Sequence, residues 1–261
     1  MPAQPKFVGT LKGTKVLLIG GSSGIGFGVA QHLIEEGASV AIASSSQSKV
    51  TDAVSRLNDG EKQYNADSGR VSGHTVDLAG QGAEESLKKL FEEVGKVDHL
   101  VYTAGILNPR PLKDQTYEHI VATGDVRFTS AILAVKTAVH GGYLKEGGSI
   151  VLTTGSAYQY PTPDWAVLGA YCGAFISLTR AFALEFSSRN IRVNCVSPGP
   201  IKTELWAGIP PAVEEQLAAG VLTGKVGRVE DVALTYVALI KNRNINGETV
   251  NDDGGGFHGK L

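Results

Sequence analysis

Glycines and serines that follow the first apolar run have the spacing of a phosphate cradle. The run KVLLIG at residues 15–20 leads into Gly20-Gly21-Ser22-Ser23-Gly24-Ile25-Gly26, which opens an amphipathic helical pattern. Glycines allow the backbone to turn tightly against a pyrophosphate, and the helix N-terminus adds unpaired N–H groups and the positive end of its dipole. The spacing predicts a dinucleotide site here. The alternative is a glycine-rich turn that only packs.

Hydroxyl groups at the end of the second apolar run bear on the choice of dinucleotide. This run, SVAIAS, ends at Ser44 and continues into Ser45 and Ser46, with Lys49 close behind and no acidic residue. An acidic side chain here would bind the adenosine ribose 2′-OH of NAD and repel the 2′-phosphate of NADP. The serines and Lys49 therefore favour NADP(H). The alternative is a plain helix cap at Ser46 or Ser48.

These motifs need a sheet to position them, and strand-length apolar runs recur between helical patterns along the chain. Such alternation is typical of βαβ units with a parallel sheet. A polar, glycine-punctuated stretch at 47–72 predicts a helix and a surface loop, and no linker separates two halves. We therefore expect one α/β domain over residues 1–261. The predicted strands are residues 15–20, 39–44, 74–78, 99–105, 149–155, 191–199 and 248–255.

Composition narrows the class of protein further. The formal net charge is −2 and no basic run occurs, which argues against nucleic-acid binding. The longest apolar runs have strand length and residues 1–15 lack an apolar centre, so we expect no membrane span and a cytoplasmic location. Cys172 and Cys195 lie in apolar segments, and the six histidines lack ligand spacing, so we expect reduced core thiols and no metal site.

Four further motifs lie at the carboxyl ends of predicted strands. Asp77-Leu78 ends the third, Tyr102-Thr103-Ala104-Gly105 ends the fourth, Ser197-Pro198-Gly199-Pro200-Ile201-x-Thr203 begins within the end of the sixth, and Asp253-Gly254-Gly255 ends the last. Together with the glycine pattern, they make the chain resemble the short-chain dehydrogenase/reductase superfamily over almost its entire length. The resemblance implies a Rossmann fold with a seven-stranded parallel sheet, helices on both faces and NAD(P) across the carboxyl edge of the sheet. It also implies a homodimer or homotetramer built through the fourth and fifth helices.

The same resemblance implies roles for single residues around the cofactor. Ile25 and Leu78 would flank it, and Ile201 and Thr203 would hold the nicotinamide amide. The usual Asn-Asn-Ala-Gly has become Tyr-Thr-Ala-Gly, and Ile19 replaces the usual threonine before the first glycine. Both changes leave backbone roles intact. The remaining residues that the resemblance places at the cofactor are Asp77, Thr103, Ala104, Gly105, Pro198 and Gly199.

Members of this superfamily normally reduce carbonyl groups with an Asn-Ser-Tyr-Lys tetrad. Counting without gaps from well-matched segments puts the tyrosine position on Leu168, the lysine position on Cys172, the serine position on Gly155 and the asparagine position on Arg127. All four residue types are replaced. We therefore expect that the usual proton donor is missing.

Nearby hydroxyl groups could substitute for the tetrad. Tyr171 lies three residues after the tyrosine position, within about 60° of the same helix face. Phe175 stands where a lysine would complete a Tyr-x-x-x-Lys motif, and Thr154 and Ser156 flank the serine position. The alternatives are a packing role for Tyr171 and local turn hydrogen bonds for the other two hydroxyls.

Loss of the tetrad favours a substrate that needs no proton. Hydride addition to a ketone makes an alkoxide, which requires an acid, whereas hydride addition to an iminium ion gives a neutral amine. Orientation of NADPH against C=N⁺ would then suffice. The segment Pro161-Thr162-Pro163-Asp164-Trp165 predicts a stiff aromatic wall beside a bulky substrate, or else a surface loop with Trp165 in the core. Arg127 would clamp a substrate oxygen, or pair with Asp164 or Asp125.

Within the superfamily the chain most resembles the tetrad-less fungal reductases of malbrancheamide- and paraherquamide-type biosynthesis. This resemblance implies reduction of an iminium in an indole-alkaloid precursor by NADPH, and guidance of an intramolecular Diels–Alder cyclisation in the same pocket. Arg127 and Trp165 match, but Thr162 stands at the position of their functional aspartate, and Asp164 follows two residues later. The catalytic candidates are Arg127, Thr162, Asp164, Trp165 and Tyr171. The alternatives are a carbonyl reductase with a substitute proton donor and a non-catalytic NADPH-binding module.

Overall fold

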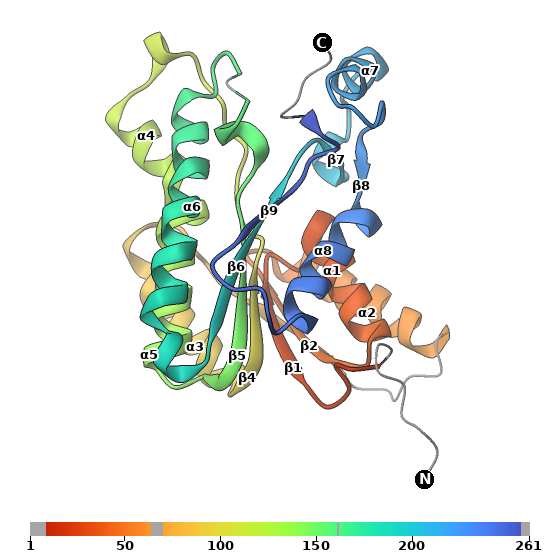
Figure 1. Cartoon of the computed structure of the whole chain (residues 1–261), viewed down its shortest axis with the longest axis vertical. Coiled ribbons are helices and arrows are strands. Elements are labelled where there is room, and N and C mark those ends of the chain that lie inside the picture. The colour runs from red at the N-terminus through yellow and green to blue at the C-terminus, as the bar shows by residue number, and fades with distance from the viewer. Residues whose placement is uncertain (1–8, 64–69, 161, 257–261) are drawn as a thin grey trace.

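Strands rich in Val, Ile, Leu and Ala form the centre of the computed structural model, which describes residues 9–63, 70–160 and 162–256 (Figure 1). Among these residues, seven strands pair in parallel in the order β3-β2-β1-β4-β5-β6-β9. The predicted Rossmann sheet is thereby confirmed. The strands are β1 Lys15–Ile19, β2 Ser39–Ser44, β3 Val71–Thr75, β4 Val97–Tyr102, β5 Leu144–Thr153, β6 Arg192–Pro198 and β9 Thr249–Asp252.

Helices cover both faces of this sheet, as predicted. On one face lie α1, α2 and α8, and on the other lie α3, α5 and α6 (Figure 1). The polar stretch 47–72 contains α2, while part of its expected loop, 64–69, lies outside the described residues. The helices are α1 Gly24–Glu35, α2 Gln47–Gln63, α3 Ala83–Val94, α4 Tyr117–Gly124, α5 Ser130–His140, α6 Ala166–Glu185, α7 Pro211–Ala219 and α8 Val229–Lys241.

Side chains of the central strands enter two core clusters on opposite faces of the sheet. In β1, Leu17 and Ile19 pack on the side of α3 and α5, while Val16 and Leu18 pack on the side of α1 and α8, and all four are fully buried. A strand that is buried on both faces forms a continuous apolar run, which is why this strand could be found from the sequence. Burial of each such side chain stabilises the fold by about 1.5–3 kcal/mol.

The third strand differs from its prediction. It was expected at 74–78, but β3 spans Val71–Thr75 at the edge of the sheet, where it pairs with β2 alone and leaves most of its side chains exposed or half-buried. Val76 and Leu78, which suggested a strand, follow it and turn into the core. An edge strand does not need apolar residues on both faces, so the apolar pattern marked the wrong residues.

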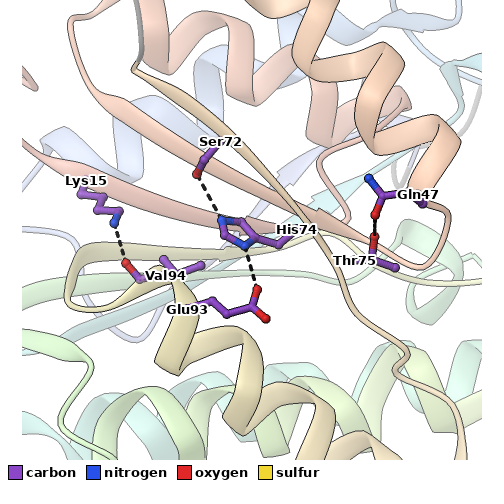
Figure 2. Close-up of polar contacts among 7 residues, drawn as sticks. All are labelled: Lys15, Gln47, Ser72, His74, Thr75, Glu93 and Val94. Carbon is purple, nitrogen blue, oxygen red and sulfur yellow. Dashed lines mark hydrogen bonds and ion pairs between the residues drawn. The ribbon is translucent and has the colours of Figure 1, made fainter.

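Polar contacts attach this edge strand to the helices beside it (Figure 2). Thr75 Oγ1 donates to Gln47 Oε1 of α2 at 2.6 Å. His74 lies between Ser72 Oγ and Glu93 Oε2 of α3, with one ring nitrogen 3.2 Å from each oxygen. Side-chain hydrogen bonds therefore help to hold β3 in place, whereas the central strands are held by burial of apolar side chains.

One helix, α6, is longer and more apolar than the sequence analysis allowed. By length and composition it could cross a membrane, so the expectation that no apolar run exceeds strand length is wrong for this segment. Leu168, Cys172 and Phe175 bury one side of the helix within the fold. Only 28% of the apolar stretch of this helix is buried, so part of its apolar surface is uncovered.

Short elements that the sequence did not predict lie beyond the carboxyl edge of the sheet. A separate two-stranded sheet pairs β7, Ile201–Lys202, with β8, Gly227–Arg228, and α7 lies close to it (Figure 1). On the opposite side of the molecule, α4 packs against α6. Elements therefore flank the carboxyl edge on two sides, where open α/β sheets bind their ligands.

Candidate active site

The predicted phosphate cradle joins β1 to α1 and packs against the end of β4. Gly20 has a φ of +97°, and a Cβ on it would lie 2.6 Å from both Thr103 Oγ1 and the Ala104 nitrogen. A Cβ on Gly26 would lie 2.2 Å from the Gly20 carbonyl oxygen. Neither position has room for a side chain. These glycines therefore allow close packing of the turn against the sheet. This packing was the alternative interpretation of the glycine pattern.

The first turn of α1 presents its backbone toward the segment after β7. Ser23, the N-cap residue, is extended and its side chain makes no capping hydrogen bond. A Cβ on Gly24 would meet no atom closer than Thr203 Cγ2 at 3.4 Å. The Gly24 N–H donates to a carboxylate oxygen of Glu204 at 2.8 Å. The N-terminus of α1 can bind an anion, and the carboxylate of Glu204 is bound there.

The serines after β2 divide between local hydrogen bonds and exposure. Ser22 Oγ donates to Ser44 Oγ at 2.9 Å, which links the cradle to β2. Ser46 Oγ accepts the Lys49 N–H at 3.4 Å, the contact that the helix-cap alternative described. Ser45 and the Lys49 side chain are exposed beside it. The end of β2 therefore offers hydroxyl groups and one cation to a ligand.

The other cofactor candidates lie at the carboxyl ends of strands or directly after them. Thr103 Oγ1 lies 3.3 Å from the Ile19 carbonyl and 3.2 Å from that of Gly20, which ties the end of β4 to the cradle. Ser130 Oγ of α5 donates to the Leu78 carbonyl at 2.7 Å. The candidates after β3, β4 and β6 are Asp77, Leu78, Thr103, Ala104, Gly105, Pro198, Gly199, Ile201 and Thr203.

Residues that the sequence analysis assigned to the tetrad positions lie close together beside the end of β5. A Cβ on Gly155 would lie 3.7 Å from Cys172 Sγ of α6. The Cys172 carbonyl accepts the Thr154 hydroxyl at 2.7 Å, so that hydroxyl is engaged locally. Burial raises the pKa of the Cys172 thiol, and the positive charge of Arg127 opposes the rise. Leu168 is buried one turn earlier on the same helix. A neutral thiol and a guanidinium therefore occupy this corner of the site.

Arg127 is buried on a π-helical turn, Asp125–Thr129, between α4 and α5. Its Nη2 donates to the Ile106 carbonyl at 3.1 Å, and its Nε has no hydrogen-bond partner within the described residues. Burial lowers the pKa of the guanidinium. A Cβ on Gly105 would lie 3.1 Å from Cζ of Arg127, so the absence of a side chain there makes room for the cation beside a predicted cofactor residue.

Two contacts fix this π-helical turn. The Tyr102 hydroxyl donates to the Val126 carbonyl at 2.5 Å. The carboxylate of Asp125 accepts the Gly80 N–H at 2.7 Å, so it is turned away from an ion pair with Arg127. Sequence reasoning missed the role of Tyr102, although a tyrosine in place of the usual asparagine was the available signal. The alternative role for Arg127, an ion pair with Asp125 or Asp164, is not found in the described part of the chain.

Tyr171 lies against a different part of the fold. A Cβ on Gly124 would lie 2.2 Å from its ring, and its ring centroid is 5.8 Å from that of Phe128. Consecutive helical residues point about 100° apart, so Tyr171 and Cys172 face different neighbours. The structure brings Cys172, not Tyr171, to Gly155.

The loop before α6 is exposed and has one residue in a rare conformation. Asp164 has a φ of +69°, and its carbonyl accepts the Arg110 N–H at 3.0 Å. Trp165 is half-buried, and its backbone N–H donates to the Thr162 carbonyl at 3.1 Å, which closes a turn. The Thr162 and Asp164 side chains are exposed, and residue 161 lies outside the described residues. The structure places this loop directly before the helix that carries Cys172.

Comparisons with known proteins agree with this architecture. The model of the SDR-like Rossmann domain matches residues 7–258. The chain is 37% identical to the short-chain dehydrogenase/reductase fsr5 of Gibberella fujikuroi, with 98% of each chain covered. It is 36% identical to the short-chain dehydrogenase/reductase malC of Malbranchea aurantiaca, with 94% of this chain and 95% of malC covered.

Solved structures give the same result. The MalC reductase/Diels-Alderase from Malbranchea aurantiaca superposes with a TM-score of 0.86 at 33% identity, covering 95% of this chain and 98% of MalC. The angucycline C-6 ketoreductase LanV, determined with bound NADP, superposes with a TM-score of 0.85 at 25% identity, covering 97% and 98% of the two chains. Together with the strand order and the glycine cradle, these matches place the chain in the short-chain dehydrogenase/reductase family of oxidoreductases.

Proposed function

We propose that this oxidoreductase uses NADP(H) to reduce an iminium group in a bulky, indole-alkaloid-type substrate, and that the same pocket guides an intramolecular Diels–Alder cyclisation. The observation that carries the proposal is the local arrangement of the four residues that we assign to the tetrad positions: Gly155, a buried Leu168, a buried Cys172 and a buried Arg127. Gly155 and Leu168 have no ionisable side chain, and burial raises the pKa of the Cys172 thiol, which makes it a weaker acid than an ordinary thiol. The likeness to a protein named as a reductase/Diels-Alderase supports this choice of reaction.

The strand ends suit a phosphorylated dinucleotide. Gly20 and Gly26 keep the turn close to the sheet, and the first N–H groups of α1 lie beyond it. Ser44, Ser45 and Lys49 suit a ribose 2′-phosphate, because they combine hydroxyl donors with a cation and bring no negative charge. The NADP bound to LanV supports the same choice. When bound, NADPH supplies a hydride from its nicotinamide ring.

The reduction needs no proton from the protein. A hydride added to the iminium carbon brings two electrons, the π pair of C=N⁺ moves to nitrogen, and the cation becomes a neutral amine. What the protein must supply is orientation and a desolvated pocket. Arg127 contributes to orientation, since its guanidinium makes one hydrogen bond to the described residues and has further N–H groups that can donate to a substrate oxygen.

The loop before α6 supplies the rest of the pocket in this proposal. Trp165, half-buried at the start of α6, gives an indole face on which a heteroaromatic substrate stacks. The exposed Asp164 carboxylate attracts a cationic substrate toward that face, and Thr162 adds a hydroxyl group.

The test is a comparison of substrates. Purified protein is incubated with NADPH and a dipeptide-derived indole iminium, and in parallel with a panel of simple ketones, while nicotinamide absorbance and product mass are followed together. We expect NADPH oxidation with the iminium, at equal moles of amine product, and none above background with the ketones. A cyclised product at the same oxidation level as the amine would indicate the cycloaddition.

Other results would point elsewhere. Turnover of ketones would overturn the proposal and favour a carbonyl reductase with a substitute acid. NADPH binding without turnover of either substrate class would favour a non-catalytic binding module.

We also propose that the protein is a homo-oligomer in which a second copy covers the uncovered side of α6. An open apolar groove of about 470 Å³ lies there. Alanines with a few larger apolar side chains allow close approach of a facing helix, and contiguous exposed apolar surface commonly marks an interface. The groove is lined by Ile120, Phe128, Ala166, Val167, Ala170, Tyr171 and Ala174.

A further inference from the structure

A carboxylate occupies the N-terminus of α1, at the point where the proposed cofactor would place its pyrophosphate. Glu204 begins a short 3-10 turn, Glu204–Trp206, directly after β7 and Thr203. Its Oε2 accepts the Gly24 N–H at 2.8 Å, a contact between residues 180 positions apart in the chain. A Cβ on Gly24 would lie 3.8 Å from the same oxygen and 3.4 Å from Thr203 Cγ2. The segment after β7 therefore lies directly against the first turn of the cradle helix.

No acidic or capping side chain of α1 itself competes with Glu204 for the N-terminus of this helix. α1 is a 12-residue helix with no acidic residue in its first turn, and its N-cap Ser23 makes no side-chain capping bond. A carboxylate at such a terminus is stabilised both by the hydrogen bond and by the helix dipole. The nearest basic residue in sequence, Lys202, pairs instead with Glu214, with Nζ 2.9 Å from each carboxylate oxygen.

We propose that Glu204 is an internal substitute for the cofactor pyrophosphate, so that the dinucleotide binds only by displacing this carboxylate from α1. The inference rests on the proposed function, because it requires a dinucleotide at the cradle. Glu204 thereby sets the affinity and the release of the cofactor, and it couples the segment 203–206 to cofactor occupancy.

The physical basis is competition for one donor. The Gly24 N–H cannot fully satisfy a carboxylate and a phosphate oxygen at once. On displacement Glu204 loses a charge-assisted hydrogen bond, and its negative charge then lies close to the negative phosphates. Binding of any ligand with a pyrophosphate is therefore weakened, whereas a ligand that reaches only the end of β2 is unaffected.

The experiment measures ligand affinity in the intact protein. NADPH is titrated by its fluorescence, and adenosine 2′-monophosphate, which has no pyrophosphate, by calorimetry. The variants are Glu204→Gln, which keeps the shape, and Glu204→Ala, which also removes the acceptor. Glu214→Gln is the matched control, since it removes a charge from the neighbouring pair with Lys202.

We expect both Glu204 variants to bind NADPH about fivefold to tenfold more tightly than the unmodified protein, with the larger gain for alanine. Glu214→Gln should leave the NADPH affinity unchanged, and all variants should bind adenosine 2′-monophosphate equally. Unchanged or weaker NADPH binding by both Glu204 variants would overturn the inference and leave the proposed function standing. An equal gain for adenosine 2′-monophosphate would overturn it as well, because the effect would then be general electrostatics.

A failure of the proposed function looks different. If the unmodified protein and every variant bind neither NADPH nor NADH, the cradle holds no dinucleotide and the inference falls with it.

Discussion

Two arginines are buried in the described part of the chain, and their hydrogen bonding differs. The guanidinium of Arg192 donates to the carbonyls of Leu239, Ile240 and Ile245 at 2.8–3.1 Å. Arg127 donates to one carbonyl and leaves Nε without a partner in the described residues. An unsatisfied buried cation opposes folding, so its presence indicates a use other than stability.

This difference gives a paired prediction. Replacement of Arg192 by Met removes three hydrogen bonds and should lower the free energy of unfolding by about 2–4 kcal/mol. Replacement of Arg127 by Met removes a poorly satisfied charge, so stability should stay within about 1 kcal/mol or rise. Turnover of the iminium by the Arg127 variant should nevertheless fall at least about tenfold. Urea denaturation and the NADPH oxidation assay measure the two effects. Equal destabilisation of both variants would make Arg127 a structural residue.

At this scale the sequence predicted which residue types meet, but not how they interact. Counting residues back from well-matched segments assigned Arg127, Gly155 and Cys172 to one site. This works because residues a fixed number of positions apart in a regular helix or strand lie at a fixed distance from one another. It could not predict that Nε of Arg127 lacks a partner, since that depends on the position of the Ile106 carbonyl in an irregular loop. Nor could it predict the contact of Glu204 with Gly24, which joins residues far apart in the chain.

Among the elements, β4 contains a histidine whose surroundings make stability depend on pH. Burial lowers the pKa of His99 to about 4, Asp98 opposes that shift, and Arg192 adds to it. One ring nitrogen lies 2.9 Å from Ser149 Oγ of β5. The ordinary pKa of histidine is 6.5, so the unfolded chain binds the proton first as the pH falls.

The protein should therefore lose stability as the pH falls from about 6.5 to about 4, by up to about 3 kcal/mol from this residue. His99→Asn, which retains a polar side chain for Ser149, should flatten that part of the profile. Urea denaturation at a series of pH values measures it. His140→Asn, on the exposed end of α5, is the control and should follow the profile of the unmodified protein. A steep profile that persists in His99→Asn would assign the effect to other groups.

Elements were predictable where burial dictates the residue types. The central strands β1, β4 and β6 are covered on both faces, so their apolar runs marked them within a few residues. The edge strand β3 was misplaced, because hydrogen bonds from its side chains to Gln47 and Glu93 supply part of its attachment in place of apolar burial. The π-helical turn was not predictable, since Tyr102 stabilises it from another element.

For the whole molecule, the groove on α6 gives a test of whether copies of the chain assemble through it. Replacement of Val167, one of the apolar lining residues, by Arg would place a charge at the proposed interface and should shift the protein toward monomers. Light scattering after size-exclusion chromatography measures the mass. Gln31→Arg, on the exposed side of α1, is the control and should leave the mass unchanged. A monomeric unmodified protein, or an unchanged mass for Val167→Arg, would contradict the proposed interface.

The packing of α1 against α8 has a consequence for synthesis of the chain. A Cβ on Gly28 of α1 would lie 2.2 Å from Val229 Cγ1, so the cradle helix rests closely on a helix translated about two hundred residues later. Contacts of such long separation form slowly, and they cannot form while α8 is still inside the ribosome. The nascent chain must therefore keep α1 without this support until α8 has emerged from the ribosome. A dinucleotide site at the cradle can be completed only after that point.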